Sequence, residues 1–303
     1  MADATQIIQI YATAGEFLAQ MQGRLEAQEA LYGLMLGLAL RLHHYSERIE
    51  LPPYLATVTD RDGAMTAALM TPPHGPILYS ESTAYASALA RLAQHMQSVH
   101  PTLPLVNGPT HLSATFAQCW AELTGVTAEM IRQERVFELR QVNSLAYCAG
   151  HMRLATMDDV RLAAAWITDF GREALGEEGT DPAAAIPGVQ QRIHDQSLYL
   201  WENGVGEVVA LAGSTRPTPH GISIGPVYTP PAWRGRGYAT ALVASLSQHL
   251  LDRGYDFCAL FTDLANPTSN SIYQKIGYRP VGDYTVYRFS DLSRSTHSVQ
   301  VAS

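Results

Sequence analysis

One tripeptide occurs twice in this chain, and its two settings predict a duplicated fold. Pro73-His74-Gly75 and Pro219-His220-Gly221 each follow a pair of strand-like segments and precede a third. Further along, Pro109-Thr110 and Pro267-Thr268 each open a helical segment after a short apolar one. Repetition of one element order along a chain is typical of tandem units. We therefore expect two related α/β domains, joined near residue 148.

The length and composition of the chain fit two domains. Its 303 residues exceed the usual size of a single domain. With 47% hydrophobic and 16% charged residues, each half can bury a core of its own. We assign residues 1–147 to a first domain, 148–292 to a second, and 293–303 to a flexible tail.

Hydrophobic periodicity predicts the elements of the first half. Two amphipathic helices occupy residues 5–45 and break near Gly23. Two strands then span 54–71 around an Asp-Gly turn, and a third lies within 73–80. The half ends with a helix at 82–98, a strand at 103–106, a helix at 109–125 closed by Gly125, and a strand at 135–142.

The second half repeats this order. A strand begins near Met152, a helix runs to Phe170, and a loop rich in Gly, Pro and acidic residues spans 171–188. Two strands at 198–214 flank an Asn-Gly turn, and a third spans 219–229. The remaining predicted elements are a helix at 237–251, a buried strand from Phe257, a short helix capped by Gly277, and a strand pair.

A glycine-rich turn, "WRGRGYA" (233–239), follows the third strand of the second half and directly precedes a helix. The first N–H groups of a helix lack partners and lie at the positive end of its dipole. Glycine lets a phosphate approach them closely, and Arg234 and Arg236 add positive charge. The turn predicts a pyrophosphate site, or else only tight packing. It matches neither a Walker loop nor a dinucleotide fingerprint.

A second motif follows this turn and makes the chain resemble a known family. Arg234, Gly237 and Ala239 match the pattern Arg/Gln-x-x-Gly-x-Gly/Ala, and residues 266–278 match Asn-Pro-x-Ser-Asn-x-x-Tyr-x-Lys-x-Gly-Tyr. Together they resemble the GNAT family of acetyl-coenzyme A-dependent N-acyltransferases, over about 150–290. The resemblance implies the GNAT-like α/β fold, an α+β mixed sheet, in two tandem domains.

The resemblance also implies roles for particular residues. Tyr273 would protonate the departing thiolate, and the backbone N–H of Tyr228 would stabilise the oxyanion, in a strand splayed near Pro226 so that the cofactor arm can pair with its edge. The alternative interpretation is that Asn266 only caps the helix and Tyr273 is a core residue. The expected acetyl-CoA contacts are Val227, Tyr228, Arg234, Gly235, Arg236, Gly237, Tyr238, Ala239, Thr240, Asn266, Asn270 and Tyr273.

The general base is less well defined by the sequence. We take Glu207 as the candidate, with Glu202 and His220 as alternatives, because the strand at 221–229 contains no carboxylate. By resemblance, the acidic loop borders the acceptor site. Its acidic residues would attract a cationic amine, or they are solvated surface; they are Glu173, Glu177, Glu178 and Asp181.

The first half departs from the family pattern at the equivalent turn. Glu81 follows the strand where the phosphate turn would lie, and no Arg-x-x-Gly-x-Gly/Ala pattern is present. A carboxylate facing a phosphate is repulsive. We therefore expect a degenerate repeat that binds no cofactor and instead packs on the active half or helps to shape its acceptor pocket.

The expected activity is transfer of an acetyl group from acetyl-CoA to a primary amine of a small molecule, by direct attack in a ternary complex. The alternatives are acetylation of a protein or peptide amine, and a non-catalytic module that senses acetyl-CoA. Because Asn270 and Tyr273 are both retained, the enzyme is favoured over the sensor. No metal is expected.

Charge and cysteine content bound the partners and the compartment. The net charge of −8 is spread without a basic cluster, so no nucleic-acid partner is expected. The most apolar run, at 30–40, is too short to span a bilayer. Three separated cysteines and an N-terminus without a basic region favour the cytoplasm. The sequence leaves open whether the chain forms a homodimer.

Overall fold

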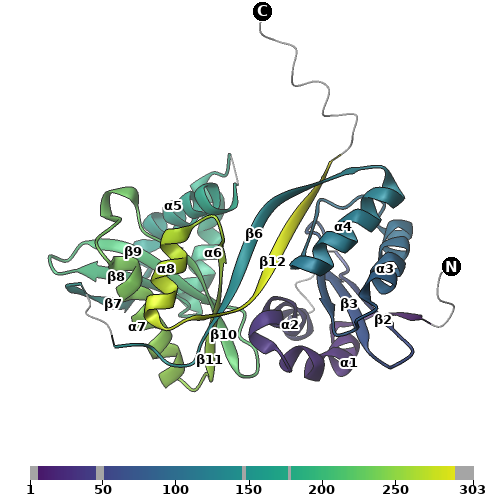
Figure 1. Cartoon of the computed structure of the whole chain (residues 1–303). Coiled ribbons are helices and arrows are strands. Elements are labelled where there is room, and N and C mark those ends of the chain that lie inside the picture. Colours follow the sequence, from purple (N-terminus) through teal and green to yellow (C-terminus); the bar gives the residue numbers. More distant parts are fainter. Residues whose placement is uncertain (1–5, 46–50, 145–147, 177–178, 291–303) are drawn as a thin grey trace, which may run out of the picture. The chain divides into compact units, whose positions relative to one another are not determined.

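The computed structural model describes residues 6–45, 51–144, 148–176 and 179–290 (Figure 1). The tail expected at 293–303 lies outside these residues. By its internal contacts the chain divides into two units, Met1–Arg135 with Gly282–Ser303, and Val136–Val281. None of the described helices is long and apolar enough to cross a membrane.

The two repeats have the same order of elements, which confirms the predicted duplication. Each contains a strand, two helices, three strands, a helix, a strand, a helix and a long final strand. The first repeat comprises β1 (Ile7–Ile10), α1 (Ala14–Glu26), α2 (Glu29–His44), β2 (Tyr54–Thr59), β3 (Met65–Met70), β4 (Ile77–Ser80), α3 (Tyr85–Val99), β5 (Leu105–Pro109), α4 (Thr110–Thr124) and β6 (Thr127–Leu139). The second comprises β7 (Gly150–Leu154), α5 (Val160–Phe170), α6 (Pro182–His194), β8 (Leu198–Asn203), β9 (Val208–Thr215), β10 (Gly221–Tyr228), α7 (Tyr238–Asp252), β11 (Phe257–Asp263), α8 (Pro267–Ile276) and β12 (Arg279–Ser290).

The repeated tripeptide has a packing reason. In each repeat its glycine lies at or just before the last of the three consecutive strands, β4 or β10, where a parallel neighbour begins. A Cβ on Gly75 would overlap the carbonyl oxygen of Leu105, and one on Gly221 would overlap the ring of Phe257. Leu105 and Phe257 are the first residues of β5 and β11. Glycine is therefore required at both positions so that the parallel strands can approach.

The final strands of the two repeats are exchanged. In the strand order, β12 of the second repeat lies beside β5 of the first, and β6 of the first repeat lies beside β11 of the second. Pairing of Tyr284 with Pro109 through Arg288 with Leu105 joins β12 to β5, and Phe137 of β6 is buried in the second core. This exchange explains why the units divide at 135/136 and 281/282, within β6 and β12. The boundaries expected from the sequence fall after residues 147 and 292.

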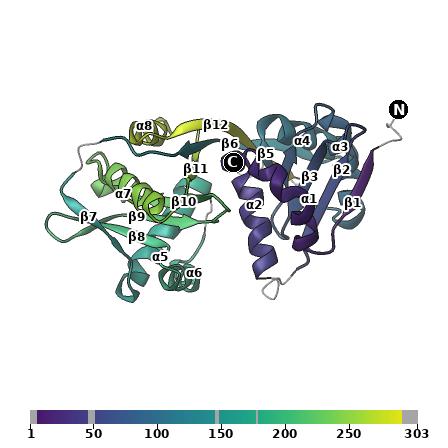
Figure 2. The same cartoon turned by 90° about the horizontal axis from the view of Figure 1, so that it is seen from below.

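The sheet of the second unit is covered on both faces. Helix α7 lies on one face, and α5 and α6 lie on the other (Figure 2). Leu242 and Leu246 of α7 share a core with Ala212 of β9. On the opposite face, Ala163 of α5 packs with Leu211 of β9 in a separate cluster. Strand β10, between β9 and β11, thus belongs to a sheet with two differently lined faces.

Several predicted elements were wrong in detail. The break between the first helices falls after Glu26 and not at Gly23, and β1 precedes them. Helix α6 occupies part of the predicted acidic loop, because Asp181 caps it by accepting from the Ala183 N–H at 2.9 Å. The segment after Gly277 is one long strand, β12, where a strand pair was expected. Strand β6 begins at Thr127, earlier than predicted.

Candidate active site

Strands β10 and β11 separate part-way along their length. Their parallel pairing runs from Gly221 with Phe257 to Ser223 with Ala259, and within these two fully described strands it goes no further. The register of β10 against β9 also shifts between Ile224 and Val227. Such a bulge bends a strand away from its neighbour. The second half of β10 therefore presents an open edge toward β11, at the position where the family resemblance implied a splay.

The turn after β10 leads directly into α7. Gly235 and Gly237 have φ angles of 76° and 84°, in the left-handed region that favours glycine. Gly237 is the N-cap residue of α7, and no side chain caps the helix there. The first-turn N–H groups of α7 are thus available to an anion, as the sequence pattern predicts. A pyrophosphate fits this turn.

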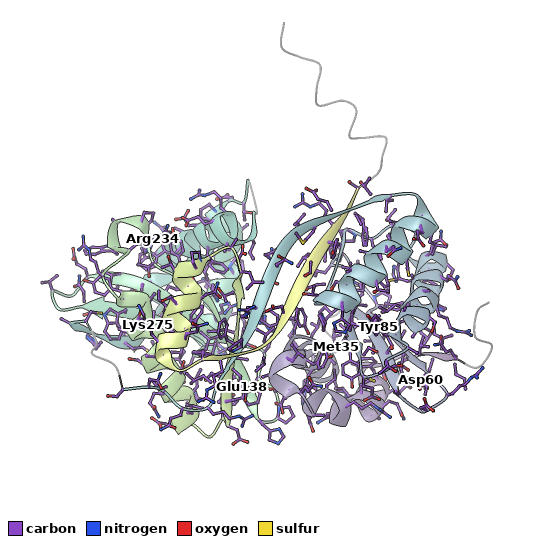
Figure 3. The ribbon with its side chains drawn as sticks, viewed as in Figure 1. Met35, Asp60, Tyr85, Glu138, Arg234 and Lys275 are labelled. Carbon is purple, nitrogen blue, oxygen red and sulfur yellow. The ribbon has the colours of Figure 1, made fainter. Side chains whose placement is uncertain are left out.

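The two arginines of the turn have different partners. Arg234 donates from Nη2 to Glu173 at 2.6 Å and from Nε to the Thr229 carbonyl at 2.9 Å; it lies in the second unit (Figure 3). Arg236 lies over the Trp233 ring, 4.9 Å from its centroid. The charge of Arg234 is therefore balanced by Glu173 in this structure, while Arg236 is held by stacking.

Glu173 also connects the turn to β10. The Tyr228 hydroxyl donates to Glu173 Oε1 at 3.1 Å, and its ring lies 6.3 Å from that of Trp166. Burial, reinforced by the Glu173 carboxylate, raises the pKa of Tyr228 to about 12. Tyr228, Glu173 and Arg234 form one hydrogen-bonded cluster, which we call the Glu173 cluster. From the sequence alone, Glu173 was expected only as part of an acidic rim.

Tyr273 lies on α8 with only 8% of its surface exposed. Its ring lies 6.4 Å from Phe137 and 5.9 Å from Tyr278. Burial raises its pKa to about 12, so the phenol stays protonated at neutral pH. Among the described residues its hydroxyl has no hydrogen-bond partner. A protonated and uncommitted hydroxyl is chemically suited to donating a proton.

The two predicted asparagines stabilise the turn between β11 and α8. Asn266 caps α8 by accepting from the Ser269 N–H at 3.0 Å, as the capping interpretation predicts. Asn270 donates to the carbonyls of Asp263 and Asn266, at 3.1 and 2.8 Å. Its Oδ1 is buried and has no protein partner among the described residues. Asn270 therefore has one buried acceptor that no described residue satisfies.

The carboxylates predicted as bases lie elsewhere. Glu207 is in the turn between β8 and β9, where its Oε2 accepts from Asn203 at 3.1 Å. Leu211 pairs with Tyr228, so four residues of extended chain, about 13 Å, separate Glu207 from that position. Glu202 is paired with Arg153 at 3.0 Å. His220 directly precedes β10 at the end opposite Tyr228, so the structure brings none of these three side chains to Tyr228.

The equivalent turn of the first repeat is occupied by its own side chains. Glu81 accepts from the Met65 N–H and from the Tyr79 hydroxyl, each at 3.0 Å, and pairs with Arg24. The carboxylate thus lies between β4 and α3, where the second repeat has its glycine-rich turn. This arrangement agrees with a degenerate first repeat.

A comparison with protein families identifies the second repeat. Residues 163–278 match the family model described as Acetyltransferase (GNAT) family. That segment runs from α5 through α8 and contains the glycine-rich turn, the splayed strand and Tyr273. The second repeat is a GNAT domain. No curated protein matches the chain.

Solved structures extend the likeness to nearly the whole chain. A GCN5-related N-acetyltransferase from Sphaerobacter thermophilus has a TM-score of 0.61 at 17% identity, with 95% of this chain and 96% of that chain covered. A tandem GNAT protein from the clavulanic acid biosynthesis pathway has a TM-score of 0.56 at 9% identity, with 94% and 98% covered. A GCN5-related glucosamine N-acetyltransferase region of a fungal multi-domain protein has a TM-score of 0.55 at 12% identity, with 95% and 38% covered. The chain has the tandem GNAT fold.

Proposed function

We propose that the GNAT domain transfers an acetyl group from acetyl-CoA to a primary amine of a small molecule, by direct attack in a ternary complex. The open edge of β10 beside the uncapped start of α7 is the observation that carries this proposal. An extended ligand with a pyrophosphate at one end fits such an edge and helix terminus together.

In this proposal the backbone supplies most of the cofactor contacts. The N–H groups of Arg236, Gly237 and Ala239 hold the pyrophosphate, with Gly235, Tyr238 and Thr240 around them. Val227 and Tyr228 offer backbone groups to the pantetheine arm. The remaining contacts come from Arg234, Asn266, Asn270 and Tyr273. The Oδ1 of Asn270 has an acceptor free for the ligand.

Acetyl-CoA, when bound, supplies an activated thioester carbonyl. The N–H of Tyr228 donates to the carbonyl oxygen and stabilises the charge that develops on it. Tyr273 holds the proton that the sulfur needs when the C–S bond breaks, which its raised pKa permits. The attacking amine must also lose a proton. Because Glu207 lies in a distant turn, we assign that role to Glu173, the carboxylate in contact with Tyr228.

A small-molecule acceptor is favoured by one fold neighbour, which is described as a glucosamine N-acetyltransferase region. Acetylation of a peptide amine and acetyl-CoA sensing without catalysis are the competing outcomes. We also propose that the protein is cytoplasmic and that its activity requires no metal ion.

Calorimetric titration of the full chain with acetyl-CoA tests this function directly. We expect one site per chain, because Glu81 occupies the equivalent turn of the first repeat. Binding of two molecules per chain would show that the first repeat also binds acetyl-CoA. Absence of binding at millimolar acetyl-CoA would overturn the proposed function.

A further inference from the structure

Arg192 carries a positive charge that no described side chain balances. It lies in the last turn of α6, and its Nη1 is buried without a hydrogen-bond partner. No described residue forms an ion pair with it. Burial lowers the pKa of this guanidinium, which remains charged at neutral pH. A buried N–H group of a cation is unfavourable unless it has an acceptor, so this group is suited to an anionic ligand.

The position of Arg192 is defined by a glycine on β9. A Cβ on Gly213 would lie 3.0 Å from Arg192 Nη1, 3.0 Å from the Gly225 carbonyl oxygen and 3.3 Å from the Ser197 carbonyl oxygen. The absence of a side chain at Gly213 therefore makes room for the guanidinium. Gly213 lies between Ala212 and Ser214, which pair with Val227 and Ile224. Arg192 thus lies beside the bulge of β10.

Arg192 is on the same face of the sheet as the Glu173 cluster. Leu211 and Tyr228 are paired and belong to the core under α5 and α6. Gly213 follows Leu211 by two residues, so the direction of its Cβ is toward the same face, about 7 Å along the strand. Helices α5 and α6 cover this face (Figure 2). The unpaired cation and the Glu173 carboxylate therefore lie along the same short stretch of β9 and β10.

We propose that Arg192 binds a carboxylate of the acceptor, so that the substrate is a small amino acid or a closely related amino carboxylate. This inference rests on the proposed function. A guanidinium presents parallel N–H donors that match the two oxygens of a carboxylate. The amine of the same molecule then lies toward Glu173 and the open edge of β10. In this proposal one acceptor molecule contacts both groups, with its carboxylate at Arg192 and its amine toward Glu173.

The test compares amino acids with amines that differ only by the carboxylate. The pairs are ornithine with putrescine, tyrosine with tyramine, and arginine with agmatine, and release of the CoA thiol is followed. We expect kcat/KM to be about 10- to 100-fold higher for the accepted amino acid than for its amine, the range for a hydrogen-bonded charge pair. Arg192→Met should remove that preference without changing the affinity for acetyl-CoA, and Arg192→Lys should restore part of it.

Arg161→Met is the matched control, because Arg161 is exposed on α5 and should leave the preference unchanged. Gly213→Ala should reproduce the loss, since a Cβ there crowds the guanidinium. The proposal is overturned if amines are acetylated as well as their amino acids, if Arg192→Met keeps the preference, or if no member of the panel is acetylated although acetyl-CoA binds. Preference for an amino phosphate such as phosphoethanolamine would also overturn it. Failure to bind acetyl-CoA would refute the proposed function itself.

Discussion

At the scale of single residues, the polar and charged side chains beside the end of β10 are hydrogen-bonded to one another. Glu173 accepts from both the Tyr228 hydroxyl and Arg234, and Arg234 belongs to the turn that we propose for pyrophosphate. A guanidinium that moved toward phosphate would release Glu173 from its ion pair. Because both side chains are more than a third exposed, the ion pair between them is weak enough for such an exchange.

Tyr273→Phe tests the proposed proton donor. The hydroxyl has no partner among the described residues, so its removal should leave folding and acetyl-CoA affinity nearly unchanged. We expect kcat to fall by about 10²- to 10⁴-fold, the usual contribution of a general acid. Steady-state kinetics and calorimetry on the same preparation measure the two effects. An unchanged kcat would assign Tyr273 to the core alone.

Glu173→Gln tests the proposed base. The amide keeps the size of the side chain but cannot take a proton, so kcat should fall by about 10²-fold or more. Tyr228→Phe is the matched control, because it removes the hydrogen bond to Glu173 and leaves the carboxylate. Equal losses in the two variants would show that the contact, and not the carboxylate, is what the reaction needs. Glu207→Gln should have little effect on kcat.

At the scale of elements, the glycine-rich turn is held by backbone conformation. A Cβ on Gly237 would meet no atom within 4 Å, so the positive φ of 84° alone demands glycine. The glycines of the repeated tripeptide are required for a different reason, because a Cβ at either position would overlap neighbouring atoms. Two glycine motifs of similar appearance in the sequence thus have different physical causes.

Gly237→Ala should strain this turn without creating a clash. A left-handed conformation costs a non-glycine residue about 1–2 kcal/mol, and relaxation of the turn would shift the N–H groups at the start of α7. We expect a small loss of thermal stability and at least a tenfold loss of acetyl-CoA affinity. Gly23→Ala is the control, since Gly23 lies inside α1 with open space around it. That substitution should stabilise the folded protein slightly. If Gly237→Ala binds acetyl-CoA normally, the turn does not hold the pyrophosphate.

The elements that the sequence predicted well are those with strong local signals. The strands flanking the Asp-Gly and Asn-Gly turns, and α4 and α8 closed by Gly125 and Gly277, were found as expected. Helix α6 was missed because Pro187 and Gly188 lie inside it, although Asp181 and Pro182 form a regular helix start. The roles of Glu173 and Arg192 depend on what each side chain meets in three dimensions, and no local pattern carries that information.

At the scale of the whole molecule, many phenol groups are buried. Burial raises the pKa of Tyr228 and Tyr273 to about 12, and it raises those of Tyr278 and Tyr284 well above the usual value. In the unfolded chain these groups would ionise near pH 10. Each therefore contributes stability that is fully present below about pH 10 and is lost as the pH rises toward the folded pKa.

We therefore expect the free energy of unfolding to fall steeply above about pH 10. Each buried phenol contributes up to about 1.4 kcal/mol per pH unit in that range. Urea denaturation followed by circular dichroism between pH 8 and pH 11 measures the slope. Tyr273→Phe should reduce it by the share of one phenol. A stability that stays constant to pH 11 would contradict this account.

The exchange of β6 and β12 bears on how such a chain can evolve. Each repeat supplies the final strand of the other repeat's sheet. Loss of either donated strand would therefore leave the other repeat with an unpaired sheet edge. The first repeat can therefore lose its phosphate turn but not its strand. Natural selection would preserve it for the β-strand that it donates, long after any catalytic reason for keeping it had gone.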